Sequence, residues 1–100
     1  MRLDISHEAF QDVGRIHKIG VEKFGQLVAD EYSFELFDKM DLLVNMPQMA
    51  RERTEFKDGI RILNVNSHAI FYRIYPDRVF ILRILHGRQD WNAVFQTTTP

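Results

Sequence analysis

The 100-residue sequence is 45% hydrophobic and carries a formal net charge of −1. A chain of this size buries one modest core, which predicts a single domain over residues 1–96 and a frayed tail over 97–100, with no room for a second domain. The near-neutral charge argues against a main affinity for bulk nucleic acid, the absence of cysteine excludes thiolate metal sites, and no segment has the roughly 20 apolar residues of a membrane span. We expect a cytoplasmic protein without metal or cofactor.

A short strand and a helical hairpin are predicted for the first half of the chain. Residues 2–5 alternate polar and apolar, and Ser6 can then cap a helix over residues 7–19. Gly20 interrupts that helical pattern, and a second pattern starts at once. Its apolar residues recur every three or four positions for six turns: Val21, Phe24, Val28, Tyr32, Leu36, Met40 and Leu43. The two helices should fold back on each other and pack on a sheet.

Three strands are predicted for the second half of the chain. Pro47 ends the second helix, and the charged stretch over residues 48–59 is expected to be a surface loop. β-Branched and aromatic residues then dominate three short runs, over residues 60–65, 68–75 and 79–85. Asn66-Ser67 and the Pro76-Asp77 segment suit the turns between them. One or two helical turns through Phe95 should follow.

The strand over residues 68–75 carries apolar side chains on both faces. Ile70, Tyr72 and Ile74 share one face, while Ala69 and Phe71 lie on the other, so both faces should be covered. The predicted class is therefore α+β in the order strand, helix, helix, strand, strand, strand. We expect the helical hairpin to pack on a mainly antiparallel sheet.

Five sequence pieces carry a resemblance to a known family. They are I-S-x-x-A at residues 5–9, K-F-G at 23–25, G-I-R at 59–61, S-H-A-I-F-Y-R-I at 67–74 and R-I-L-H-G-R-Q-D-W at 83–91. Together with the order of elements, they resemble the ParE branch of the RelE/ParE toxin superfamily over roughly residues 2–95. The resemblance implies the toxin of a type II toxin–antitoxin pair, held inactive by a ParD-like antitoxin in a hetero-oligomer and poisoning DNA gyrase when free. RelE-like relatives instead cut messenger RNA on the ribosome, which is the alternative function.

The residues favour the gyrase poison over the ribonuclease. RelE-type enzymes place basic residues on the central strands and an arginine and a tyrosine late in the chain; the resemblance aligns those late positions with Gln89 and Phe95, which cannot serve. Arg83 and His86 remain as the catalytic candidates of the alternative, since a metal-free ribonuclease needs a proton donor, a proton acceptor and a phosphate-binding cation. A strand-end histidine hydrogen-bonded to backbone is the more common role for a residue like His86. We therefore predict no catalytic residue.

Partner binding is predicted from charge and from the carboxyl-terminal aromatics. Residues 1–50 hold nine acidic against five basic residues, and residues 51–100 hold five against eight. The strand half could therefore pair with an acidic partner, although internal pairing with the acidic helices is the simpler interpretation for any single arginine. An antitoxin segment would fill an apolar groove rimmed by charge, such as the helical hairpin beside the sheet could provide. The candidate partner-binding residues are Arg61, Arg73, Arg83, Arg88 and the exposed anchors Trp91 and Phe95, with Trp91 alternatively a lid on the core.

Overall fold

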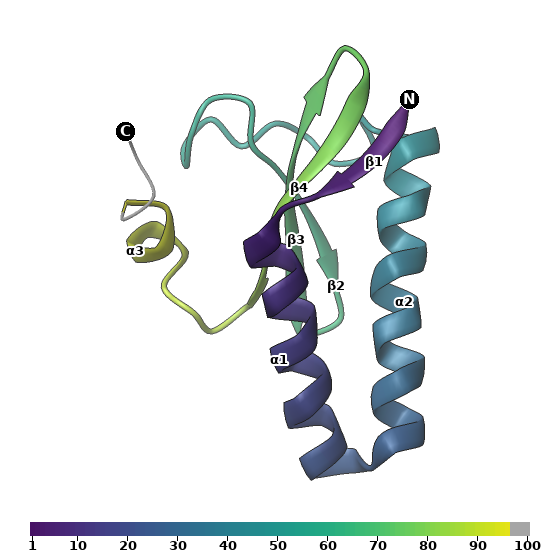
Figure 1. Ribbon diagram of the computed structural model, residues 1–100. Coiled ribbons are helices and arrows are strands. Elements are labelled where there is room, and N and C mark those ends of the chain that lie inside the picture. Colours follow the sequence, from purple (N-terminus) through teal and green to yellow (C-terminus); the bar gives the residue numbers. More distant parts are fainter. Residues whose placement is uncertain (97–100) are drawn as a thin grey trace.

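The computed structural model describes residues 1–96 and shows two helices packed against one face of a sheet (Figure 1). The predicted tail, residues 97–100, lies outside this range. A third, short helix stands on the opposite side of the sheet from the helical hairpin (Figure 1). In chain order the elements are β1 (Arg2–Ile5), α1 (His7–Phe24), α2 (Gln26–Asn45), β2 (Arg61–Val65), β3 (His68–Tyr75), β4 (Arg78–His86) and α3 (Trp91–Gln96).

The sheet has four strands in the order β1-β4-β3-β2. Strands β2, β3 and β4 form an antiparallel meander, while β1 runs parallel to β4 at the edge. Both predicted turns are present, and Asn66 takes the positive φ of 54° that its turn requires. The predicted α+β class and mainly antiparallel sheet are confirmed, with strand boundaries shifted by one residue at β2 and β4.

The helix break lies at Gly25, so the prediction that Gly20 separates the two helices is wrong. Gly25 has a φ of 90°, which a residue with a side chain rarely adopts, and it ends α1. Gly20 sits inside α1 for another reason: a Cβ there would lie 3.2 Å from the Ala29 Cβ of α2. Glycine at this position therefore allows the two helices to approach closely.

Beyond the end of the short strand β1, side chains of Ser6 and of α1 form hydrogen bonds with the exposed backbone edge of β4. The Ser6 hydroxyl donates to the Leu82 carbonyl at 2.8 Å and accepts from the Ala9 amide, which confirms Ser6 as the cap. Six residues after Ser6, the Asp12 carboxylate accepts from the backbone N–H of Ile84 at 2.9 Å and from Nε and Nη2 of Arg83 at 2.8 and 3.0 Å. Asp12 is the one charged side chain of residues 1–96 that is fully buried.

Apolar clusters cover the two faces of the sheet, as the pattern of β3 predicts. The Tyr72 hydroxyl, buried against α2, donates to the Pro47 carbonyl at 2.8 Å. On the hairpin side the buried residues include Ala9, Val13, Leu36, Met40, Leu43, Ile70, Tyr72, Val79 and Ile81. On the other side the loop before β2 and α3 cover a smaller cluster of Ile60, Ile62, Ala69, Phe71, Leu85 and Phe95.

No helix within residues 1–96 is both long enough and apolar enough to cross a membrane.

Candidate partner-binding groove

The helical hairpin projects past the ends of the strands (Figure 1). A groove lies between the projecting hairpin and the ends of β3 and β4. We call it the hairpin groove and its volume is about 590 Å³. Its walls come from the last three turns of α1, the first two turns of α2 and the ends of β3 and β4. The residues that shape it are Ile16, Ile19, Phe24, Val28, Tyr32, His68, Ile84 and His86.

The distal half of the hairpin, residues 19–28, leaves large apolar side chains in solvent. Phe24 and Leu27 are 69% and 73% exposed, and Ile19, Val21 and Val28 are also exposed. The prediction that Val21, Phe24 and Val28 belong to the core is therefore wrong, because the hairpin outruns the sheet that would have covered them. A cluster of exposed apolar side chains of this kind marks an interaction surface more often than chance.

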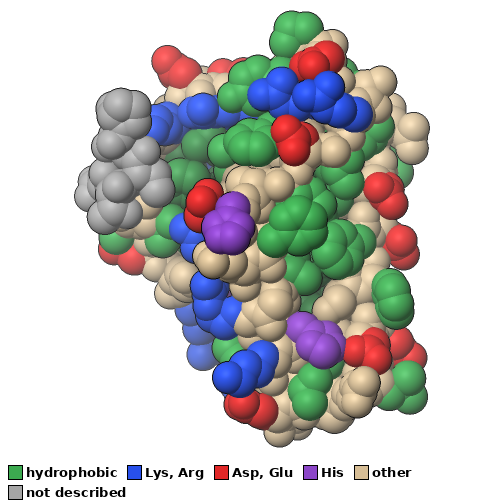
Figure 2. Space-filling view, in the orientation of Figure 1, with side chains coloured by type: hydrophobic (Ala, Val, Ile, Leu, Met, Phe, Trp, Pro, Cys, Tyr) green, Lys and Arg blue, Asp and Glu red, His purple; other side chains and the backbone are tan. Residues whose placement is uncertain are grey.

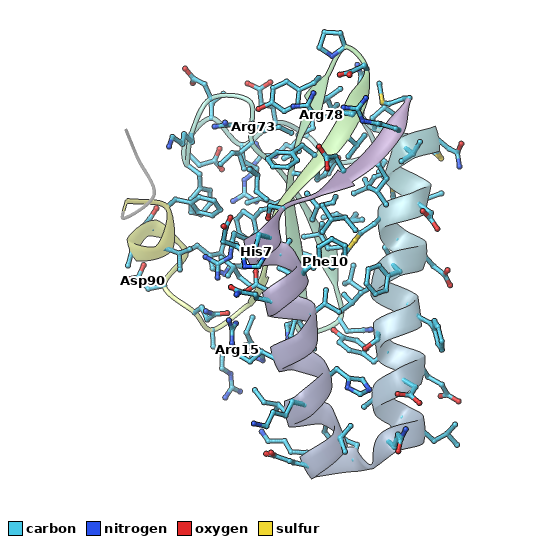
Figure 3. All side chains as sticks on the ribbon, in the orientation of Figure 1. His7, Phe10, Arg15, Arg73, Arg78 and Asp90 are labelled. Atoms are coloured by element: carbon cyan, nitrogen blue, oxygen red, sulfur yellow. The ribbon has the colours of Figure 1, made fainter. Side chains whose placement is uncertain are left out.

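Two contacts hold α1 and α2 together where the hairpin projects beyond the sheet. The His17 ring and the Asp30 carboxylate meet at 2.7 Å across the two helices, and Gly20 lets them touch at Ala29. On the face seen in Figure 2, hydrophobic side chains also gather in the seam between α1 and α2. Phe10 points into this seam in Figure 3 and is 53% exposed.

Charge around the hairpin groove is positive. Arg15 and Lys23 of α1 are among its lining residues, which include no aspartate or glutamate. Arg15 also pairs with the Asp12 carboxylate at 3.1 Å, and its side chain remains 55% exposed. Figure 3 shows Arg15 on the side of α1 turned away from α2. Basic side chains beside apolar walls favour a partner segment that is apolar on one face and acidic on the other.

A tyrosine and two histidines form the polar floor of the groove. The Tyr32 hydroxyl lies 2.7 Å from His68 Nδ1 and donates to the Val65 carbonyl at 3.1 Å. His86, opposite His68 in the β3–β4 register, has its ring centroid 5.2 Å from that of His68. Burial and the neighbouring His86 lower the pKa of His68, and burial raises the pKa of Tyr32. Both groups are therefore neutral at pH 7.

Within residues 1–96 no group of three or more histidine, cysteine or acidic side chains is placed to hold a metal ion. The prediction for His86 as a strand-end histidine bonded to backbone agrees with the geometry, because the Arg88 N–H donates to His86 Nδ1 at 3.0 Å.

Most of the arginines predicted to bind a partner make internal contacts. Arg61 donates to the Ala50 carbonyl at 2.7 Å, and Arg73 to the Asp58 carbonyl at 3.3 Å. Arg83 is held by Asp12, whose hydrogen bonds raise the pKa of the guanidinium. Arg88 alone among the four is exposed. Arg73 and Arg83 do meet, with Lys57, Glu8 and Phe95, at a smaller cleft of about 160 Å³ outside the hairpin groove.

The carboxyl-terminal aromatics pack on the protein instead of standing free. Phe95 is buried with its ring centroid 4.9 Å from that of Phe71, so the prediction of an exposed anchor at Phe95 is wrong. Trp91 is partly buried, edge-on to Phe71 at 5.0 Å, and its indole N–H donates to the His86 carbonyl. This arrangement agrees with the alternative role of Trp91 as a lid on the core.

The sequence prediction missed both Asp12 and the groove floor. Asp12 had a signal, because it falls with Ala9, Val13 and Ile16 at positions i, i+3, i+4 and i+7 of one helical face, where a charge is out of place. Tyr32 and His68 are 36 positions apart, and only the packing of α2 on the sheet brings them together.

The sequence matches a family model described as "ParE toxin of type II toxin-antitoxin system, parDE" over residues 3–91. It is 31% identical over 70 residues to a "Toxin ParE1" of Mycobacterium tuberculosis (strain CDC 1551 / Oshkosh), covering 69% of this chain and 71% of the relative. It is also 30% identical over 89 residues to a "Toxin ParE1" of Caulobacter vibrioides, covering 89% and 90%.

The fold resembles a solved structure titled "Chromosomal ParDE TA system from P. aeruginosa". The TM-score is 0.77 over 86% of this chain and 95% of that chain, at 20% sequence identity. At that identity the likeness concerns the fold alone.

Proposed function

The chain belongs to the family of ParE toxins of type II toxin–antitoxin systems, and from this premise we propose that it poisons DNA gyrase and is silenced by a ParD-like antitoxin in a stable complex. The observation that carries the antitoxin part is the hairpin groove. It combines exposed apolar walls at Ile19, Phe24 and Val28 with the cations Arg15 and Lys23. An amphipathic, acidic antitoxin segment would cover this apolar surface and pair with its rim.

The gyrase part is supported by the family resemblance and by the poor fit of this chain to ribonuclease chemistry. A metal-free ribonuclease needs cations and proton-transfer groups free to reach one phosphate. Arg83 is committed to buried Asp12, and the His86 Nδ1 accepts from the Arg88 amide, which leaves Nε2 as the one ring nitrogen of His86 without a hydrogen bond within residues 1–96. Gln89 and Phe95 occupy the positions at which the RelE branch carries its late arginine and tyrosine. Lys57, Arg73 and Arg83 do line one small cleft, but by the resemblance the late arginine and tyrosine are missing, and we infer that the toxin acts through protein contacts.

The test is to give the purified toxin to gyrase with supercoiled plasmid and, separately, to translating ribosomes with a defined transcript. We expect linear DNA to accumulate in proportion to toxin once gyrase is denatured, while the transcript stays intact. Ribosome-dependent cleavage of the transcript without linear DNA would favour the ribonuclease.

A variant pair sharpens this experiment. His86→Gln keeps a side-chain N–H but cannot act as a general acid or base, so trapping of gyrase should persist, whereas loss of a general acid or base costs a ribonuclease about 100- to 10,000-fold in rate. Arg88→Glu reverses the charge of an exposed arginine next to α3 and should weaken trapping without unfolding the protein. Melting temperatures of both variants serve as controls for folding.

A further inference from the structure

The floor of the hairpin groove presents one hydrogen-bond acceptor and one donor side by side. His68 and His86 are directly opposite in the β3–β4 ladder, with ring centroids 5.2 Å apart and ring planes at 84°. Their parity along the strands is that of Ile70 and Ile84, which face the helices, so both rings point toward the hairpin. The hydrogen bonds around each ring assign its tautomer.

His68 carries its proton on Nδ1. The Tyr32 hydroxyl has a single proton and two contacts, to the Val65 carbonyl at 3.1 Å and to His68 Nδ1 at 2.7 Å. A carbonyl can only accept, so both contacts are hydrogen bonds at once only if the hydroxyl proton goes to Val65. At the 2.7 Å contact between Tyr32 and His68, the hydroxyl oxygen therefore accepts from Nδ1–H. In a neutral imidazole the other nitrogen then holds a lone pair, which makes Nε2 of His68 an acceptor. The lowered pKa of His68 keeps this ring neutral at pH 7.

His86 has the opposite tautomer. The backbone N–H of Arg88 donates to His86 Nδ1 at 3.0 Å, so Nδ1 holds the lone pair and Nε2 carries the proton. His86 is kept in place from a second side, because its own backbone N–H donates to the Gln89 side-chain oxygen at 2.7 Å. In the described part of the chain neither Nε2 is hydrogen-bonded to another protein group, although both rings line the groove.

We propose that His68 and His86 recognise a carboxamide, the side chain of an asparagine or glutamine in the antitoxin segment that fills the hairpin groove. The amide oxygen accepts from Nε2–H of His86, and the amide N–H donates to Nε2 of His68. The proposal rests on the groove being the antitoxin site and adds the chemistry that selects its occupant.

Other polar ends fit this floor less well. A carboxylate has only acceptors and would face the lone pair of His68, while an ammonium has only donors and would face the proton of His86. A hydroxyl can donate and accept, but only through one oxygen atom, whereas the donor and the acceptor here belong to two rings with centroids 5.2 Å apart. A polar group that enters the apolar groove gives up its hydrogen bonds to water. If the histidines do not replace those hydrogen bonds, the affinity falls.

Asparagine substitutions can remove each Nε2 while leaving the structural bond of each ring in place. In His68→Asn, the side-chain NH₂ can still donate to Tyr32, and in His86→Asn the side-chain oxygen can still accept from the Arg88 amide. His86→Gln retains an N–H at the distance of Nε2. Unchanged melting temperatures would establish that all three variants are folded.

The first experiment uses the toxin alone with three matched probes: isovaleramide, isovalerate and 3-methylbutanol. Nitrogen-15 NMR of the two rings at pH 7.5 should show Nδ1–H for His68 and Nε2–H for His86. Isovaleramide should shift both rings with an affinity at least about threefold above that of the other probes, and either asparagine substitution should remove this preference. Reversed tautomers, or equal binding of the carboxylate, would refute the assignment.

The second experiment uses the purified antitoxin. Its affinity should fall about 3- to 10-fold for His68→Asn and for His86→Asn, and His86→Gln should restore most of the loss. If the antitoxin binds wild type and both asparagine variants equally, the carboxamide inference fails and the proposed function stands. If the toxin selects isovaleramide but neither binds an antitoxin nor traps gyrase, the histidine pair stands and the proposed function fails.

Discussion

The two ends of the helical hairpin use similar side chains for opposite purposes. Near the sheet, Val13, Leu36 and Met40 are buried against the strands, and Asp12 is tied to β4. At the distal end, Phe24 and Leu27 are at least two-thirds exposed although they are as apolar as the buried set. The hairpin is longer than the surface it covers (Figure 1), so apolar periodicity alone does not separate core from docking surface.

This difference separates stability from binding along one pair of helices. Substitutions near the sheet should change the free energy of unfolding, and substitutions at the distal end should change affinity for a partner. The following predictions test that division, from the largest expected effect to the smallest.

Asp12→Ala should destabilise the protein by about 3–5 kcal/mol, because it leaves the Arg83 guanidinium and the Ile84 amide without their carboxylate at a mostly buried site. Urea unfolding followed by circular dichroism measures the effect. The double variant Asp12→Ala, Arg83→Met removes the abandoned charge as well and should recover part of the loss. A loss below about 1 kcal/mol for Asp12→Ala alone would contradict the described role of Asp12.

Ile19→Asp should leave stability within about 0.5 kcal/mol of wild type, because Ile19 is 45% exposed. In contrast, it should weaken antitoxin binding about 100-fold by placing a carboxylate on an apolar wall that meets an acidic segment. Phe34→Asp is the matched control, since Phe34 is 67% exposed on α2 but does not line the groove. Equal losses of affinity in both variants would remove the groove as the binding site.

Gly14→Ala and Gly20→Ala form a matched pair within α1. Beyond the adjacent residues and the local backbone of α1, no atom lies within 4 Å of a Cβ built at Gly14, so alanine there should stabilise the helix by about 0.5–1 kcal/mol. At Gly20 the same methyl group meets the Ala29 Cβ at 3.2 Å and pushes the helices apart, so that gain should be lost. Thermal melting of the two variants gives the comparison, and an equal gain at both positions would show that close helix approach is unimportant.

The smallest effect should be the pH dependence that His68 confers. Its pKa is lowered in the folded state, so the unfolded chain binds the proton first. The contribution of His68 to the free energy of unfolding is therefore fully present above about pH 6.5. It falls as the pH drops below 6.5 toward the lower pKa that His68 has in the folded protein. The titratable groups in contact with it are Tyr32 on α2 and His86 on β4. Arg15 and Lys23 of α1 line the same groove, and Glu35 of α2 acts on Tyr32.

Urea unfolding at pH 7.5 and 5.5 for wild type and His68→Asn should show the difference. Wild type should lose more stability than the variant over this interval. An identical loss in both proteins would assign the pH dependence to other groups.

Local chemistry was predictable from the sequence, and tertiary placement was not. The Ser6 cap, the turn at Pro76-Asp77 and the two-faced strand β3 follow from neighbouring residues. Gly20 and Gly25 are alike in the sequence, and only the approach of Ala29 distinguishes a contact glycine from a hinge glycine. The groove depends on how far the hairpin extends past the strands, which no local pattern encodes. Phe95 was misjudged because α3 folds back onto Phe71.

The most direct test of the central claim is hydrogen–deuterium exchange of the toxin with and without its antitoxin. We expect the backbone amides of residues 15–32, in the projecting parts of α1 and α2, to exchange more slowly in the complex than in the free toxin. Strand amides of β3, already buried, should change little. Protection confined to α3 and the loop over residues 48–59, with the distal hairpin unchanged, would contradict the assignment of the hairpin groove.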